Sequence, residues 1–125
     1  MSRIRAKDTK PEILVRKFLH SKGLRFRLHD KKLPGKPDLV FPSRKKVVFV
    51  HGCFWHGHQG CKYFVVPKTK QEWWLNKFDK NRQRDESSID QLKSAGWDVT
   101  VIWECELKLD RLRNLEKVLK QFDIH

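Results

Sequence analysis

A short apolar run that leads directly into a cluster of cysteines, histidines and aromatic residues limits the possible folds of this chain more than any other stretch. Residues 47–50 read Val-Val-Phe-Val, a run too short for a helix and rich in β-branched residues, so it predicts a buried strand. The next positions, 51–61, hold two cysteines, three histidines and the adjacent pair Phe54 and Trp55. Hydrophobic burial alone does not require this mixture. Because open α/β sheets place their chemistry at strand ends, the stretch predicts a loop of metal ligands and bases at one sheet edge.

The rest of the chain predicts a mixed α/β domain around this strand. Thr9 and Glu12 form a capping-box pattern that opens a helix, and Thr69 and Glu72 form a second one that opens a longer helix. The long helix links the third and fourth strands, so a right-handed crossover is expected there. The 125 residues are expected to form a single domain, 1–125, whose residues 1–8 are a flexible arm. The predicted order is α-β-β-β-α-β-α, with helices over residues 9–22, 70–95 and 112–122 and strands over 25–29, 39–41, 47–50 and 97–103.

The charge of the chain favours a polyanionic partner. Lys and Arg total 28 against 15 Asp and Glu, a formal net charge of +13. Such an excess in a folded domain points to nucleic acid, and the alternative is a soluble protein with a basic surface. No apolar run approaches membrane-spanning length and the N-terminus lacks the apolar core of a signal peptide, so a cytoplasmic protein is expected.

All three cysteines of the chain fall where they could hold one metal ion. Cys53 and Cys61 follow the third strand and Cys105 follows the fourth, and with His58 they make a Cys3His set, a common composition for structural zinc. Clustered histidines and cysteines in a cytosolic chain favour metal ligation over a disulfide framework. The alternative is three buried free thiols and an exposed histidine. The spacing leaves open whether His56 or His58 is the ligand.

Five polar residues are candidates for catalysis, and four of them also have a structural explanation. Asp38 precedes a buried strand and is either a magnesium ligand at the sheet edge or a turn aspartate that caps its own loop. Glu12 either completes its capping box or orients a catalytic water or base. His51 and His56 either pack at the strand end near the zinc site or serve as general base and phosphate contact. Asp85 lies on an inward stripe of the long helix, where an unpaired carboxylate is costly. That stripe is predicted to face the core and consists of Leu75, Phe78, Arg82, Asp85, Ile89 and Leu92.

Two pairs of adjacent aromatics, Phe54-Trp55 and Trp73-Trp74, lie close to these residues in the sequence. Core packing explains some of them. Adjacent aromatics at the tip of a basic loop also suit insertion between base pairs, which exchanges base stacking for a distorted duplex. In that case the rings are expected to be exposed, on the same side of the molecule as Asp38 and His56.

Three segments then carry a more specific pattern: Leu33-Pro34-Gly35-Lys36-Pro37-Asp38, His51-Gly52-Cys53-Phe54-Trp55-His56 and Trp103-Glu104-Cys105. In this order they resemble the very short patch repair (Vsr) endonucleases, a family of DNA mismatch nicking enzymes. The likeness runs from Ile4 to Cys105. It implies a restriction-endonuclease-like fold and magnesium-dependent cleavage of double-stranded DNA 5′ to the thymine of a T:G mismatch. A monomer beside the bacterial nucleoid is expected, and participation of mismatch-repair proteins is left open.

The resemblance also implies roles for individual residues. Asp38 matches the magnesium carboxylate, and Val50 matches the position that lends its backbone carbonyl to the metal. His56 resembles the general base. His51 and Asp85 resemble the residues that line the scissile phosphate. The remaining matches are the first-helix glutamate, Glu12; the structural zinc ligands Cys53, His58, Cys61 and Cys105; the DNA-wedging aromatics Phe54, Trp55 and Trp74; and Ile4, in the arm that closes over the other groove.

Two other functions compete with mismatch nicking. One is a restriction-type nuclease that acts on fully paired duplex. The other is a DNA-binding module held together by zinc and without catalytic activity. That second function does not explain why Asp38, His56 and the inward-facing Asp85 occur together.

Overall fold

The computed structural model describes residues 9–53, 56, 58, 60–61 and 65–122. The predicted arm with Ile4, and the predicted wedges Phe54 and Trp55, lie outside these residues. The secondary-structure elements, in chain order, are α1 (Lys10–Ser21), β1 (Arg27–Leu28), β2 (Leu39–Phe41), the short 3-10 helix η1 (Pro42–Arg44), β3 (Lys46–His51), α2 (Gln71–Ser94), β4 (Asp98–Trp103), α3 (Glu104–Leu109) and α4 (Arg111–Lys120).

The four strands form one mixed sheet in the order β1-β2-β3-β4. The first two pairings are antiparallel, and β3 pairs with β4 in parallel. The parallel register runs from Lys46 opposite Asp98 to His51 opposite Trp103. Because the two strands end side by side, the loop after His51 and the residues after Trp103 begin at the same edge of the sheet.

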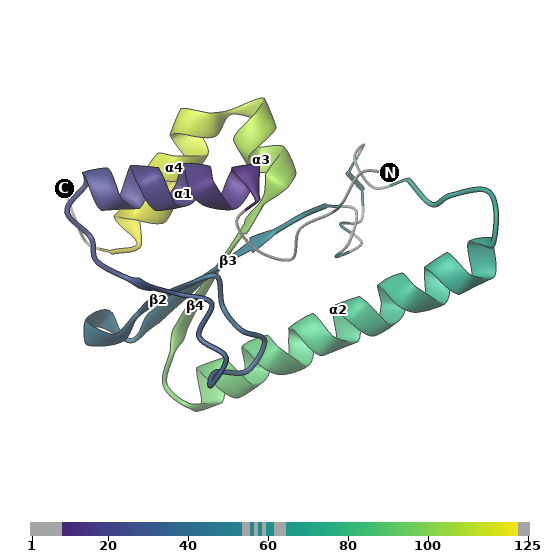
Figure 1. The fold of residues 1–125 in the computed structure, drawn as a ribbon, viewed down its shortest axis with the longest axis horizontal. Coiled ribbons are helices and arrows are strands. Elements are labelled where there is room, and N and C mark those ends of the chain that lie inside the picture. The colour runs from purple at the N-terminus through teal and green to yellow at the C-terminus, as the bar shows by residue number, and fades with distance from the viewer. Residues whose placement is uncertain (1–8, 54–55, 57, 59, 62–64, 123–125) are drawn as a thin grey trace.

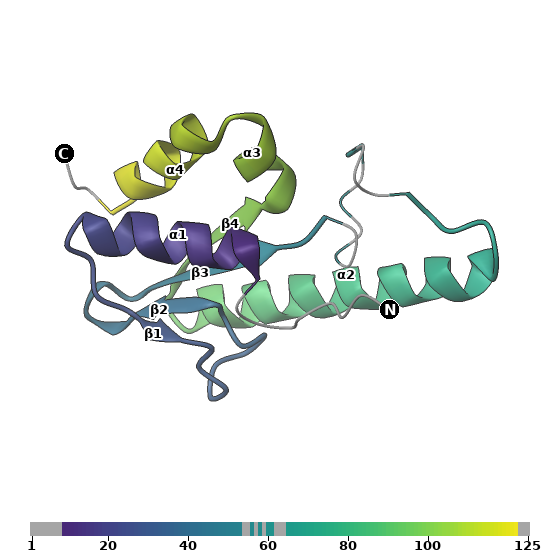
Figure 2. The same ribbon diagram turned by 45° about the horizontal axis from the view of Figure 1, so that its top comes forward.

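Helices cover both faces of the sheet (Figures 1 and 2). On one face, α1, α3 and α4 pack through residues such as Leu19, Leu107 and Leu115 against Leu39, Val48 and Ile102 of the strands. On the other face, Leu92 of α2 packs against Val40, Val47 and Phe49. Alternate residues of β3 therefore enter different cores, as the two-residue period of a strand requires.

The first half of α2 extends beyond the sheet (Figure 1). Leu75 lies there and is 50% exposed, so the prediction that it faces the core was wrong. Phe78 and Leu92 of the same stripe are buried as predicted. The helical period correctly identified one side of α2, but it contains no information on where the sheet ends beneath the helix.

Two further details differ from the prediction. Helix α2 begins after Lys70, whose backbone is left-handed (φ 54°), and no side chain caps it, so the Thr69 capping box was wrong. The stretch after β4 forms a separate six-residue helix, α3, before the predicted last helix. Six residues are too few to show a helical period in the sequence. Within the described part of the chain, no helix has the length and apolar character needed to cross a membrane.

Candidate active site and metal centre

Three clusters of potential metal-binding side chains lie near the ends of β3 and β4. The ligand atoms in each cluster lie within 4.8 Å of one another. The clusters draw on α1, the turn before β2, the end of β3, the loop after it, α2 and the start of α3. They are His51-His56-Asp85, Glu12-His29-Asp38 and Cys53-His58-Cys61-Cys105.

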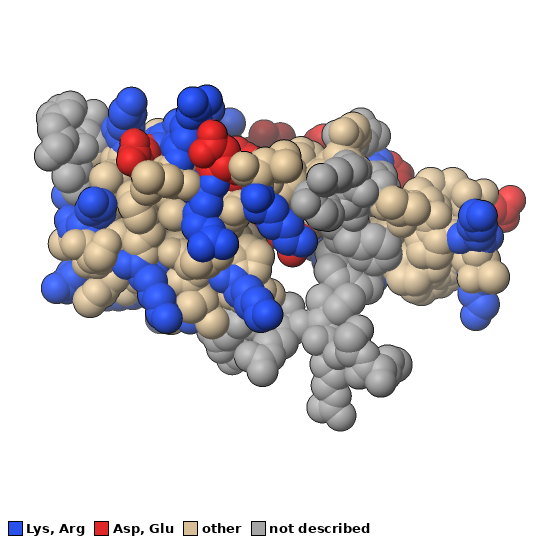
Figure 3. Space-filling view, turned by 90° about the horizontal axis from the view of Figure 1, so that it is seen from above, with Lys and Arg blue, Asp and Glu red and all other residues tan. Residues whose placement is uncertain are grey.

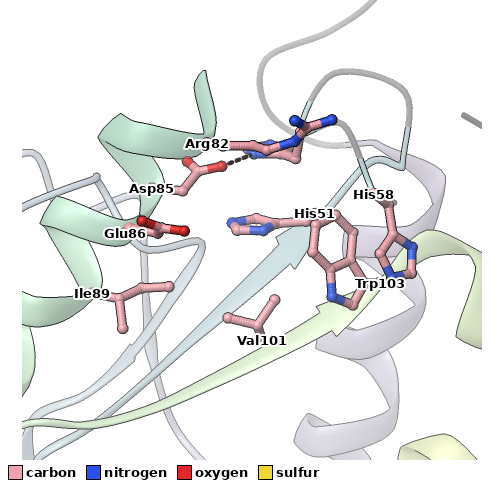
Figure 4. A pocket seen from close by; sticks show the side chains of 9 residues that line it. His51, His58, Arg82, Asp85, Glu86, Ile89, Val101 and Trp103 are labelled. Carbon is pink, nitrogen blue, oxygen red and sulfur yellow. Dashed lines mark hydrogen bonds and ion pairs between the residues drawn. The ribbon is translucent and has the colours of Figure 1, made fainter. Parts of the chain in front are cut away.

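The first cluster contains a histidine oriented by a carboxylate. His56 Nδ1 lies 2.6 Å from Asp85 Oδ2, and both side chains remain partly accessible to solvent, at 29% and 25%. Figure 4 shows the Asp85 carboxylate turned from α2 toward this ring. This contact explains why the acidic residue Asp85 can lie on the inner stripe of α2. When Nδ1–H donates to Asp85, the other nitrogen, Nε2, is left as a proton acceptor.

His51 lies directly against this pair at the end of β3. Its ring stacks on the His56 ring with centroids 3.9 Å apart and planes 4° from parallel. Only 5% of His51 is exposed. Burial, with a smaller contribution from the charge of His56, lowers the pKa of His51 to about 3. The His51 imidazole is therefore neutral at physiological pH.

Asp38 belongs to the second cluster. Its Oδ2 accepts a 2.6 Å hydrogen bond from the backbone N–H of Val50. Burial raises the pKa of Asp38, and the Val50 N–H and the nearby His29 and His56 oppose that rise. The preceding turn is held against α2 at Gly35, which has φ +75° and where a Cβ would lie 2.7 Å from Ser88 Cβ. Glycine at this position therefore lets the turn approach α2 closely.

Glu12 is 2% exposed and its carboxylate is directed into the site. Thr9 accepts from the Glu12 N–H at 3.4 Å, as half of the predicted capping box requires. The carboxylate contacts His29 Nε2 at 2.7 Å and forms an ion pair with Arg16. His29 and Arg16 were not among the site residues predicted from the sequence. Arg16 lies four residues after Glu12 on the same helix, a spacing that favours an ion pair. This spacing could have predicted the contact between Arg16 and Glu12.

The third cluster fits a four-coordinate metal ion. The Cys105 N–H donates to Cys53 Sγ at 3.3 Å, and Cys105 Sγ lies 3.5 Å from His58 Nδ1. Ligand atoms around tetrahedral zinc lie roughly 3.5 Å apart, given bonds of about 2.0–2.3 Å. The structure places His58, not His56, beside the cysteines. Burial raises the pKa of the Cys53 thiol to about 12 and raises that of Cys105.

Trp103 connects the Cys3His cluster to His51 and His56. Its ring stacks on His58 at 3.9 Å and meets His51 edge-on at 5.1 Å. The Trp103 ring therefore contacts both a candidate metal ligand and a candidate active-site group. Together these side chains border an open pocket of about 390 Å³ (Figure 4), lined by His51, His56, His58, Arg82, Asp85, Glu86, Ile89, Val101 and Trp103.

One exposed and one half-buried aromatic lie near the start of α2, and basic residues cover one face of the molecule. Trp73 is 57% exposed near the start of α2, and Trp74 beside it is half-buried and stacks on Phe78 with centroids 5.7 Å apart. Lys and Arg side chains are spread over the molecular face that carries α1 and α4 (Figure 3). These features are those of a surface that meets a polyanion.

Comparison with known proteins reveals consistent similarity to one group. The family model described as DNA mismatch endonuclease Vsr matches residues 1–62. The chain is 52% identical over 120 residues to Type II nicking enzyme V.XorIIP of Xanthomonas oryzae pv. oryzae, which covers 92% of this chain and 88% of that protein. It is 46% identical over 125 residues to Type II nicking enzyme V.NmeAIP of Neisseria meningitidis serogroup A, with coverage of 96% and 89%. It is 44% identical over 108 residues to DNA mismatch endonuclease Vsr of Escherichia coli, with coverage of 86% and 69%.

Proposed function

The chain belongs to the Vsr family of DNA mismatch endonucleases, and we propose that it nicks one DNA strand 5′ to the thymine of a T:G mismatch. The observation that carries this proposal is the oriented pair His56–Asp85 close to the half-buried carboxylate Asp38. A carboxylate that can hold a metal ion and a histidine that can transfer a proton are two groups that metal-assisted phosphodiester hydrolysis uses.

In this mechanism His56 is the general base. Asp85 holds Nδ1–H, so Nε2 takes the proton from the attacking water and Asp85 stabilises the resulting imidazolium. The neutral His51 ring beside it adds no competing positive charge. Both His51 and Asp85 line the pocket, where we place the scissile phosphate.

A divalent cation, which we infer to be Mg²⁺, is the proposed catalytic cofactor. Asp38, with the backbone carbonyl of Val50, would hold it, and Glu12 belongs to the same cluster as Asp38. The half-buried Asp38 carboxylate, held by its hydrogen bond to the β3 backbone, suits a hard cation that prefers oxygen ligands. When bound, Mg²⁺ stabilises negative charge that develops on the phosphate.

Zn²⁺ is the proposed structural cofactor at the Cys3His cluster. Four protein ligands leave no open position for substrate, so we assign this site a structural role. The ion would join the loop after β3 to the start of α3 through Cys53, His58, Cys61 and Cys105.

Further parts of the proposal concern DNA and the chain as a whole. Trp74, with Phe54, Trp55 and the arm residue Ile4, would contact the bases around the mismatch. We infer a restriction-endonuclease-like core, a single domain that works as a monomer, and a location beside the bacterial nucleoid where such DNA is found. Mismatch-repair proteins are candidate partners.

The test is nicking of a labelled T:G duplex in Mg²⁺ by wild type, Asp38→Asn and the control Asp79→Asn, which alters an exposed aspartate of α2. Loss of a metal ligand removes several kcal/mol of transition-state stabilisation, so Asp38→Asn should nick at least about 100-fold more slowly. Its affinity for DNA should change little, and the control should match wild type.

Substrate arms separate the competing functions. A matched T:A duplex nicked as fast as the T:G duplex would indicate a restriction-type nuclease. Wild type that binds both duplexes and nicks neither would indicate a non-catalytic DNA-binding module. Nicking by Asp38→Asn within about threefold of wild type would contradict the assigned mechanism.

A further inference from the structure

His29 belongs to none of the three sequence motifs that resemble the Vsr family, but it lies with Glu12 and Asp38 in the second cluster. His29 follows β1, and its Nε2 lies 2.7 Å from Glu12 Oε2. Its backbone N–H donates to the carbonyl of Asp38 at 3.2 Å, which ties the residue to the start of β2. About a fifth of the His29 side chain is exposed, while Glu12 is almost fully buried. The ring is therefore positioned between solvent and the buried Glu12 carboxylate.

The backbone of His29 is left-handed, with φ +47°. Such a conformation is unfavourable for most residues that carry a Cβ, and strained residues of this kind gather at functional sites. Here the conformation accompanies the backbone bond to Asp38 and the ring contact with Glu12. The strain is thus coupled to the position of the imidazole beside both carboxylates.

The spacing of the ligand atoms matches a shared cation. Two neighbouring ligands on an octahedral ion with bonds of about 2.1 Å lie roughly 3 Å apart. The 2.7 Å between His29 Nε2 and Glu12 Oε2 is close to this value. The Asp38 ligand atom lies within 4.8 Å of both, and opposite ligands on such an ion lie about 4.2 Å apart.

We propose that His29 ligates the cation held by Asp38, together with Glu12, so that this site combines one nitrogen with carboxylate oxygens. Imidazole binds Mn²⁺ and the later divalent transition metals more favourably, relative to Mg²⁺, than an all-oxygen site does. The site therefore accepts Mn²⁺ as well as Mg²⁺, and His29 sets the ratio of their affinities. This inference rests on the proposed function in one respect, the assignment of Asp38 as a cation ligand.

Arg16 acts against cation binding at the same site. Its guanidinium forms an ion pair with Glu12 and lies 3.4 Å from His29 Nε2. A fixed positive charge at this distance repels a divalent cation, and the repulsion is strong where the surroundings are buried. His29 and Arg16 thus have opposite effects: removal of His29 weakens binding of Mn²⁺, and removal of Arg16 strengthens it.

The experiment measures Mn²⁺ and Mg²⁺ affinity of the zinc-loaded full chain without DNA, by electron paramagnetic resonance of free Mn²⁺ and by competition with Mg²⁺. His29→Gln should weaken Mn²⁺ binding about tenfold or more and Mg²⁺ binding by a smaller factor. Arg16→Gln should tighten Mn²⁺ binding severalfold. The control His20→Gln, at an exposed histidine of α1, should match wild type.

A spectroscopic readout tests direct ligation. Electron spin-echo modulation of bound Mn²⁺ should show coupling to a histidine nitrogen in wild type and lose it in His29→Gln. His29→Asn, a residue type that tolerates left-handed backbone, repeats the test if the glutamine variant unfolds at lower temperature than wild type. Unchanged Mn²⁺ affinity, or nitrogen coupling that persists in a folded His29 variant, would overturn the inference.

Asp38→Asn separates this inference from the proposed function. If it binds Mn²⁺ as wild type does, the proposed metal assignment fails and the inference fails with it. If Asp38→Asn loses Mn²⁺ binding while His29→Gln keeps it, the inference alone fails.

Discussion

The neutral, buried His51 makes the stability of this protein depend on pH. An imidazole in the unfolded chain titrates near 6.5, whereas burial holds the pKa of His51 at about 3 in the folded state. Below pH 6.5 the unfolded state therefore binds a proton that the folded state does not, and stability is lost as pH falls toward 3. Between pH 7 and pH 5 wild type should lose about 2 kcal/mol more free energy of unfolding than His51→Gln.

Urea unfolding at a series of pH values, with zinc present for both proteins, measures this difference. His20→Gln is the matched control, because His20 is exposed and its removal should leave the slope of wild type unchanged. Parallel pH profiles for wild type and His51→Gln would show that His51 is not held neutral by burial.

Among the structural elements, the parallel pair β3 and β4 brings the metal cluster together. Cys53 follows β3, and Cys105 opens α3 directly after β4. The free energy of binding a structural ion contributes to the free energy of folding, because the unfolded chain does not assemble the ligands. We expect one zinc ion per chain by elemental analysis. Cys105→Ser should lose it and lower the melting temperature by on the order of 10 °C, as a loss of several kcal/mol implies.

Treatment of wild type with a chelator supplies the comparison for this variant. Once the ion is removed, wild type and Cys105→Ser should unfold at similar temperatures. Nicking should also fall in both, because Trp103 packs between His58 and His51 and transmits displacement of the loop. Wild type without bound zinc, or equal melting with and without chelator, would rule out the structural ion.

For the whole molecule, net charge and exposed aromatics should contribute differently to DNA binding. The charge of +13 predicts salt-sensitive affinity for any duplex. A wedging ring adds most where base stacking is already weak, as at a mismatch. Trp74→Ala should therefore reduce the preference for T:G over T:A duplex about tenfold, since stacking on a base contributes roughly 1–3 kcal/mol.

Lysine substitutions on α4 provide the contrast. Lys117→Ala and Lys120→Ala change exposed charges and should weaken binding of both duplexes alike, with a shallower dependence on salt. Fluorescence anisotropy with both duplexes at several salt concentrations measures these effects. A Trp74→Ala protein with an intact T:G preference would remove this ring from mismatch recognition.

Much of the secondary structure and many of the candidate site residues can be predicted from the local sequence. The strand at residues 39–41 and the long helix are as predicted to within a residue or two, because their hydrophobic periods are local properties. The sequence also singled out Asp38, His51, His56, Asp85 and the Cys3His set, which the structure gathers at one sheet edge. These site residues could be predicted because most of them are metal-ligand or base residue types that lie next to a predicted strand, which the local sequence shows directly.

Other features depend on contacts between distant segments. His29 joins Glu12 only because α1 packs on the sheet, and no spacing in the sequence relates these two residues. Leu75 is exposed because the sheet ends before α2 does. His58, and not His56, lies beside the cysteines because β3 and β4 end side by side, which brings the loop after β3 next to Cys105. Local periodicity specifies which side of an element is apolar, but the neighbours of that side depend on how the elements pack in three dimensions.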